Sequence, residues 1–197
     1  MRLIDRWVGI PLCFFASFWP LKKAQADSNS TLATNIPPPD TIVFIGIAEI
    51  GALVVAYPAI KETRKQHPKS RICFITAPAG LQTLELMGFE KEDIFLLETS
   101  SIKSLLKGIV NIRSHFKGRR VSAIVLEPFT RFSTLLSAWI GASKRIGCYR
   151  FLNEGVYLGN ILTHRLVYNP HLHMSQTYFA LAKALIEPDS AKPLLKE

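Results

Sequence analysis

Cysteine is scarce in this sequence. The 197 residues include three cysteines, Cys13, Cys73 and Cys148, which lie far apart and form no CxxC pair. This spacing argues against a disulfide framework and against a thiolate metal site. Cys73 and Cys148 lie in apolar, strand-like runs. We therefore expect buried, reduced and inert thiols, which suit a protein that faces the cytosol.

Acidic residues are also in short supply, with 15 Asp and Glu against 24 Lys and Arg and a formal net charge of +9. Such a balance favours anionic partners: nucleic acid, phospholipid headgroups or a phosphorylated glycolipid. The sequence has no zinc-finger spacing and no aromatic ribonucleoprotein motif, so we expect no nucleic-acid partner. Most of the clustered cations are expected on a solvated face: Lys103, Lys107, Arg113, Lys117, Arg119, Arg120, Lys144, Arg145 and Arg150.

An apolar run long enough to span a membrane is missing near the amino terminus. Residues 7–21 carry no charge and five aromatic side chains, but a spanning helix needs about 20 apolar residues. Three interpretations stay open: a cleaved signal peptide, a transmembrane helix, and a segment that lies in the membrane interface. Flanking cations and the breaks at Pro11 and Pro20 favour the interfacial segment. Residues 22–40, rich in Ser, Asn and Pro, then read as a tether that completes a first region, 1–40.

Residues 41–187 alternate between strand and helix patterns, and we predict one domain there. Expected strands are 41–47, 71–76, 93–97, 121–126 and 144–148. Expected helices are 50–66, 81–87, 101–116, 132–140 and 174–186. Five apolar strands separated by helices predict an α/β fold with a Rossmann-like, doubly wound parallel sheet.

The loop after the first strand matters most, because ligands bind at the carboxyl ends of strands in such sheets. Residues 46–51 (GIAEIG) nearly match the dinucleotide pattern GxGxxG, but Ala48 replaces the second glycine. Ala52 and Leu53 replace the Lys and Ser or Thr of a phosphate-binding P-loop. NAD(P) binding is therefore the less favoured alternative. Free amide groups at the start of the following helix should attract an anion or a hydroxyl-rich ligand.

Several motifs in order carry a resemblance to a known family. Residues 43–60 (VFIGIAEIGALVVAYPAI) combine a buried strand, a glycine loop and a helix with Pro-Ala about two turns in. Residues 125–142 (VLEPFTRFSTLLSAWIGA) form a later strand and helix, and further matches lie at 150–157 and 162–174. Together, over about residues 41–185, they resemble the amino-terminal domain of family 9 glycosyltransferases, which include the lipopolysaccharide heptosyltransferases.

The resemblance implies one half of a GT-B fold, in which the amino-terminal domain holds the acceptor and a carboxy-terminal domain holds the nucleotide-sugar donor. Residues 188–197 would begin the linker to that second domain, so this chain would be a fragment or would act with a partner, and would be inactive alone. The implied activity is inverting transfer of a sugar from a nucleotide-diphosphate sugar to a cell-envelope glycolipid or saccharide. We expect such an enzyme at the cytoplasmic face of the inner membrane. We expect it to need neither a cofactor nor a metal ion. The alternative is a non-catalytic module that binds an anionic glycolipid.

Candidate site residues follow from this resemblance and from their positions. In heptosyltransferases the loop glycine is followed by an Asp taken to be the general base, whereas Ala52 follows Gly51 here. Glu49 is the nearest substitute, although a first-turn helix charge explains it equally well. Arg131 follows the fourth strand and is placed either to meet an acceptor phosphate or carboxylate or to form a surface ion pair.

Besides Gly51 and Arg131, three further residues are predicted to bind the acceptor. Asn153 and Glu154 precede Gly155 and either hydrogen-bond sugar hydroxyls or cap a turn. His164 is predicted to line the same side of the acceptor site. His171 and His173 form an isolated HxH, which makes a poor zinc site, so we predict that they cap the last helix.

Overall fold

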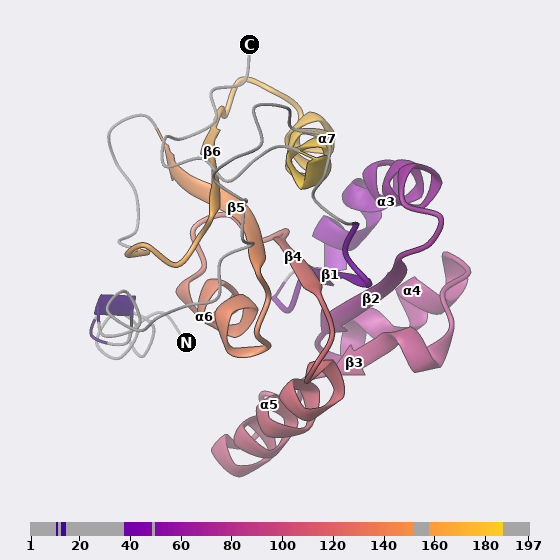
Figure 1. Cartoon of the computed structure of the whole chain (residues 1–197), viewed down its shortest axis with the longest axis vertical. Coiled ribbons are helices and arrows are strands. Elements are labelled where there is room, and N and C mark those ends of the chain that lie inside the picture. The colour runs from indigo at the N-terminus through magenta and orange to yellow at the C-terminus, as the bar shows by residue number, and fades with distance from the viewer. Residues whose placement is uncertain (1–10, 12, 15–37, 49, 152–157, 187–197) are drawn as a thin grey trace.

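A computed structural model of the chain describes residues 11, 13, 14, 38–48, 50–151 and 158–186 (Figure 1). Its centre is a parallel sheet of six strands in the order β3-β2-β1-β4-β5-β6. The strands are β1 (Thr41–Ile45), β2 (Arg71–Thr76), β3 (Ile94–Leu96), β4 (Val121–Val125), β5 (Lys144–Phe151) and β6 (His164–Tyr168). Because the chain winds outward from β1 to β3 and then returns to add β4 to β6 on the other side, the sheet is doubly wound, as predicted.

Helices cover both faces of the sheet. They are α3 (Ile50–Gln66), α4 (Leu81–Leu86), α5 (Ile102–Phe116), α6 (Arg131–Trp139) and α7 (Met174–Lys183). Short 3-10 turns occur at η1 (Pro78–Gly80), η2 (Lys91–Asp93) and η3 (Ala184–Ile186). Helices α3, α4 and α7 contribute to the core on one face, with α3 and α7 side by side (Figure 1). Helices α5 and α6 cover the other face.

The strands are apolar because both faces of the sheet are buried. All five residues of β1 are buried, and β1 pairs in register with β2 on one side and β4 on the other. Ile42 and Phe44 point to the α3 and α7 face, while Val43 and Ile45 point to the α5 and α6 face. This alternation explains the continuous apolar run that marks each central strand in the sequence.

The predicted strands need correction in number and in length. A sixth strand, β6, lies at the edge of the sheet, where only five strands were expected. Its pattern is mixed, because His164 and Leu166 are buried while Arg165 is half-buried, so it lacks the continuous apolar run used to find the others. Strand β5 extends to Phe151 with an irregularity between Cys148 and Arg150. Strand β1 ends at Ile45, two residues earlier than predicted.

Two of the cations expected on a solvated face are buried, which corrects that prediction. The ammonium of Lys144 donates to the carbonyl oxygen of Leu185 at 2.9 Å. Arg145 is 1% exposed, and its guanidinium donates to the carbonyl oxygens of Ile161 and Ala142, each at 2.5 Å. Carbonyl acceptors compensate part of the cost of burying these charges.

The predicted burial of the cysteines is confirmed, since Cys13, Cys73 and Cys148 are all buried. Burial raises the pKa of both Cys73 and Cys148 to about 12, which keeps these thiols protonated. Within the described part of the chain, no helix is both long and apolar enough to cross a membrane. The predicted membrane segment (7–21) and tether (22–40) lie almost entirely outside the described residues, and so does the predicted linker, 188–197. The division of the chain into these regions therefore stays a prediction.

Candidate functional site

The candidate site lies at the carboxyl ends of β1 and β4. These two strands are neighbours in the sheet, but the chain leaves them in opposite directions, to β2 on one side and to β5 on the other. Their loops therefore separate at the point where ligands bind in doubly wound folds. The loop after β1 leads into α3, and the loop after β4 leads into α6.

A buried carboxylate joins these two loops. Glu127, 6% exposed, follows β4, and its Oε1 accepts hydrogen bonds from the backbone amides of Ile47, at 2.6 Å, and of Ala48. The hydroxyl of Ser133, in the first turn of α6, donates to Oε2 at 2.5 Å. One side chain thus fixes the turn after β1, the loop after β4 and the start of α6 relative to one another.

The anion site predicted from the free amides at the start of α3 stays a prediction, but the turn before that helix already binds a negative charge of the chain. The amides of Ile47 and Ala48 are already satisfied by a negative charge from the chain itself. A pyrophosphate brought to the same donors would have to displace Glu127 and would meet its charge. The hydrogen bonds also explain why β1 ends early, because the amide of Ile47 bonds to Glu127.

The loop after β4 holds an uncommon backbone conformation. Phe129 has a φ of 61°, which a side chain with a Cβ seldom adopts. Its ring packs edge-on against the ring of Tyr168 in β6, with centroids 5.6 Å apart. Packing by Phe129 and hydrogen bonding by Glu127 together hold the loop, and backbone strain of this kind concentrates at functional sites.

Two predicted site residues lie at the starts of the helices that leave this edge. Gly51 is exposed in the first turn of α3, and a methyl group built on it would meet no atom within 4 Å. Arg131 is the first residue of α6, and only 8% of it is exposed. The fold therefore brings both residues to the same edge of the sheet. Their roles in binding an acceptor stay predictions.

The remaining predicted residues divide into two groups. Glu49, Asn153 and Glu154 lie outside the described residues. His164 is fully buried in β6, and its Nδ1 lies 2.9 Å from the hydroxyl of Thr163. The burial favours a structural role for this ring, while a contact between His164 and an acceptor stays a prediction.

The capping role predicted for the HxH pair is confirmed for one member. His173 is the N-cap of α7, where its Nδ1 accepts from the amide of Ser175 at 3.3 Å. The backbone amide of His171 donates to the side-chain oxygen of Asn169, two residues earlier, at 3.0 Å. Among the residues that the structure describes, no group of three or more His, Cys, Asp or Glu could hold a metal ion.

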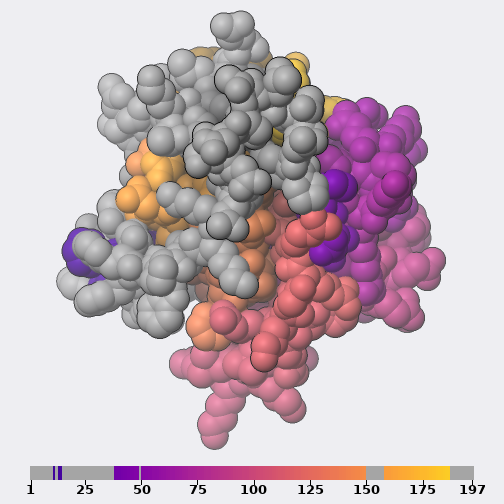
Figure 2. All heavy atoms as spheres, viewed as in Figure 1, coloured from indigo at the N-terminus to yellow at the C-terminus, as the bar shows by residue number. Residues whose placement is uncertain are grey.

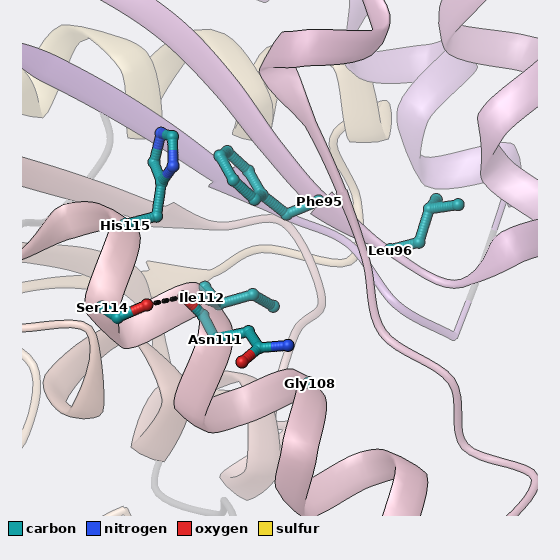
Figure 3. Close-up of a pocket in the computed structure, with 7 residues that line it drawn as sticks. All are labelled: Phe95, Leu96, Gly108, Asn111, Ile112, Ser114 and His115. Atoms are coloured by element: carbon teal, nitrogen blue, oxygen red, sulfur yellow. Dashed lines mark hydrogen bonds between the residues drawn. The ribbon is translucent and has the colours of Figure 1, made fainter.

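A pocket of about 390 Å³ lies elsewhere, between β3 and α5 (Figure 3). Its lining is mostly apolar or neutral, with Phe95 and Leu96 from the strand and His115 at the end nearest the turn after α5. Burial lowers the pKa of His115, which favours the neutral ring. The pocket is at the outer strand of the sheet and is lined by no residue of the β1 or β4 loops, so we do not assign the chemistry to it.

No family model and no curated protein sequence matches the chain. Its fold is shared with solved family 9 glycosyltransferases. A glycosyl transferase family 9 structure from Veillonella parvula DSM 2008 is similar with a TM-score of 0.55 and 16% identity, over 78% of this chain and 44% of that one. E. coli heptosyltransferase WaaC with ADP-2-deoxy-2-fluoro heptose is similar with a TM-score of 0.56 and 9% identity, over 77% and 50%.

The same E. coli enzyme with ADP gives a TM-score of 0.54 at 9% identity, over 77% of this chain and 49% of that one. The chain thus spans about half the length of the solved structures it matches. At these identities the likeness establishes the fold, an α/β Rossmann-like domain of the kind found in those enzymes.

Sequence reasoning missed Glu127, the residue that organises this edge. Its position, directly after an apolar strand and before a helix, was a usable signal, because polar residues at the carboxyl ends of parallel strands face the site. The partners of Glu127 could not be read from the sequence, since the amides of Ile47 and Ala48 are 80 and 79 residues away.

Proposed function

We propose that this chain is the acceptor-binding half of a family 9 type glycosyltransferase. In the complete enzyme a sugar would pass from a nucleotide-diphosphate sugar to a cell-envelope glycolipid or saccharide. The observation that carries the proposal is the shared fold, in which the chain coincides with about half of each solved enzyme. The E. coli structures contain ADP or an ADP-heptose analogue, which supports a nucleotide sugar as the donor.

The proposed reaction needs one base and one site for the acceptor. An acceptor hydroxyl attacks the anomeric carbon, the bond from that carbon to the diphosphate breaks, and the configuration at the carbon inverts. The hydroxyl proton passes to a carboxylate, for which we assign Glu49. Ala52 cannot take this role, because its side chain accepts no proton and is buried against the sheet.

Glu127 supports this assignment as a positioning residue. Its carboxylate holds the amides of Ile47 and Ala48, which directly precede Glu49 in the chain. A base must come within about 3 Å of the hydroxyl it activates, so the turn that carries it needs a fixed backbone. Arg131, nearly buried at the neighbouring helix start, would orient a phosphate or carboxylate of the acceptor.

The location proposed for the complete enzyme is the cytoplasmic face of the inner membrane, where nucleotide sugars and nascent glycolipids meet. The net charge of +9 supports a phosphorylated, anionic acceptor. A dinucleotide-binding function is less well supported, because Glu127 occupies the amides that a pyrophosphate would need.

The test is sugar transfer from a radiolabelled ADP-sugar to a cell-envelope glycolipid extract, with the donor-binding half supplied as a longer protein or as a second chain. Glu49→Gln should lower turnover by about 10² to 10⁴, the usual cost of losing a general base. Glu62→Gln, on the same helix but far from the turn, is the matched control and should retain parental turnover.

Turnover of Glu49→Gln within about twofold of the parent would remove Glu49 from the mechanism. Binding of the glycolipid without transfer by the completed protein would instead favour the non-catalytic module. Neither result depends on how the protein associates with membranes.

A further inference from the structure

Helix α5 carries an apolar stripe that points outward. Ile102, Leu106 and Val110 are spaced by four residues, so they lie on one face, and they are 76%, 58% and 57% exposed within the described part of the chain. A second stripe on the same helix, through Ile112 and Phe116, packs into the core. A core-facing stripe is ordinary for a helix on a sheet, whereas a contiguous exposed one marks an interaction surface.

Both halves of α5 pack on the domain, since Leu105 and Ile109 are half-buried against the same core as Ile112 and Phe116. Ile112 and Phe116 are the buried residues of this helix. Arg113 donates from Nη1 to the carbonyl oxygen of Trp139 at 2.6 Å, and its guanidinium lies over the Trp139 ring, 4.7 Å from the centroid. Helix α5 lies at the lower edge of the molecule in Figures 1 and 2, and Ile102, Leu106 and Val110 stay exposed beside its buried side.

The charges around this stripe have one sign. Residues 99–126 contain six Lys and Arg and no Asp or Glu. Lys103 and Lys107 each follow a stripe residue by one position, about 100° further around the helix, so they border the stripe. Trp139, 46% exposed, lies beside Arg113 at the end of the stripe. Apolar side chains bordered by lysines, with a Trp at the margin, form the pattern of a helix that lies in a membrane interface.

We propose that α5 docks the domain onto an anionic lipid bilayer. The apolar stripe of Ile102, Leu106 and Val110 enters the boundary between headgroups and acyl chains, and Lys103 and Lys107 contact headgroup phosphates. A second copy of this chain fits the same surface poorly, because the cations on the two copies would face one another. This surface is distinct from residues 7–21 and does not depend on the proposed sugar transfer.

The sheet places this surface near the candidate site. Helix α5 follows β3, which is parallel to β1, so its first residue lies toward the same edge of the sheet as the turn after β1. Docking through the amino-terminal half of α5 would therefore bring that edge to the lipid surface, where the headgroup of a membrane-bound molecule is accessible.

A local reporter separates this surface from any other membrane contact of the full chain. An environment-sensitive dye is attached to Val110→Cys, and to Leu86→Cys as the control, a position 91% exposed on α4. The three native cysteines are buried and should not compete for the dye. Vesicles of phosphatidylcholine with phosphatidylglycerol should shift the emission of the dye at position 110 to the blue, and vesicles of phosphatidylcholine alone should not.

Three outcomes of this experiment would overturn the proposal. Vesicle-bound protein whose dye at position 110 is unchanged would show that another segment makes the contact. A blue shift that grows with protein concentration in the absence of vesicles would identify a second copy as the occupant of the stripe. An equal shift at position 86 would likewise contradict a specific role for α5.

Variants that remove positive charge from α5 give an independent measure of its contribution to vesicle binding. The pair Lys103→Gln with Lys107→Gln should weaken binding to the anionic vesicles by about tenfold or more, and added salt should reduce the difference from the parent. The control pair Lys65→Gln with Lys69→Gln removes the same charge from exposed positions at the end of α3 and after it. Equal weakening by both pairs would mean that net charge alone, and not α5, determines binding.

Discussion

The two halves of the sheet are built from different chemistry. In the half formed by β1, β2 and β3, the buried polar side chains of the described residues are threonines, at positions 41, 63 and 76. In the half formed by β4, β5 and β6, the structure buries Glu127, Arg131, Lys144 and Arg145 among the described residues. The first half is an apolar scaffold, and the second half depends on hydrogen bonds to charged groups.

Two glutamates illustrate the difference. Glu98 and Glu127 occupy equivalent positions, each two residues after the end of a strand, β3 and β4 respectively. Glu98 is exposed at the outer strand, while Glu127 is buried where the chain reverses the direction of winding. The same residue type is a solvated charge in one place and joins two loops in the other, because only the second position faces amide donors.

The largest expected effect comes from Arg145→Met in the second half. The substitution leaves the carbonyl oxygens of Ile161 and Ala142 buried without their donor, which should lower the free energy of unfolding by about 2 to 5 kcal/mol. The counterpart in the first half is Ile75→Val, a core truncation that should cost about 0.5 to 1.5 kcal/mol. Urea denaturation measures both. Equal costs would contradict the contrast between the halves.

A smaller effect is expected for Glu127→Gln. The neutral amide oxygen accepts less strongly than the carboxylate, and Ser133 would have to accept from the amide nitrogen instead of donating, so the hydrogen bonds from Ile47 and Ala48 should weaken, at a cost of about 1 to 3 kcal/mol. Hydrogen exchange at the amides of Ile47 and Ala48 should accelerate. Glu98→Gln is the matched control and should change neither quantity. Unchanged exchange in the Glu127 variant would show that the carboxylate does not hold the turn.

The smallest expected effect is on the pH dependence of stability. Burial lowers the pKa of both His67 and His115. The unfolded chain therefore binds more protons than the folded chain below the ordinary histidine pKa, and stability should fall as the pH drops below about 6.5. His115→Phe preserves ring packing against Phe95 and should reduce this slope. Thermal denaturation at a series of pH values around the ordinary histidine pKa measures this change of stability with pH. Ser114→Ala is the control and should behave like the parent. An unchanged pH dependence in His115→Phe would contradict the prediction.

Prediction from sequence succeeded where local pattern and burial coincide. The bounds of α3 and β2 agree with those expected, since their apolar residues repeat with helical or strand spacing. Prediction failed for β6, an outer strand whose residues alternate between buried and half-buried. It also failed for Lys144 and Arg145, whose carbonyl partners come from residues 41 and 16 positions away in the chain.

The sequence predicted where the candidate site lies in the sheet, but it predicted only some of the contacts within the site. A glycine turn after an apolar strand indicated the edge of the sheet, and Gly51 and Arg131 lie at that edge as expected. Free amides were expected at the start of α3, and this stays a prediction; the hydrogen bonds from two amides of the preceding turn to Glu127 were not foreseen. Such pairing depends on which strands are neighbours, which sequence spacing does not reveal.

The sequence by itself determined a doubly wound α/β domain, since apolar runs of strand length alternating with amphipathic helices have few other ways to bury their surfaces. Tertiary structure decided which charges lie inside and which apolar residues lie outside. Burial of a charge requires a partner, and the partners of Glu127 and Arg145 are supplied by segments that only folding brings together. The exposed stripe of α5 likewise follows from how little of that helix the sheet can cover.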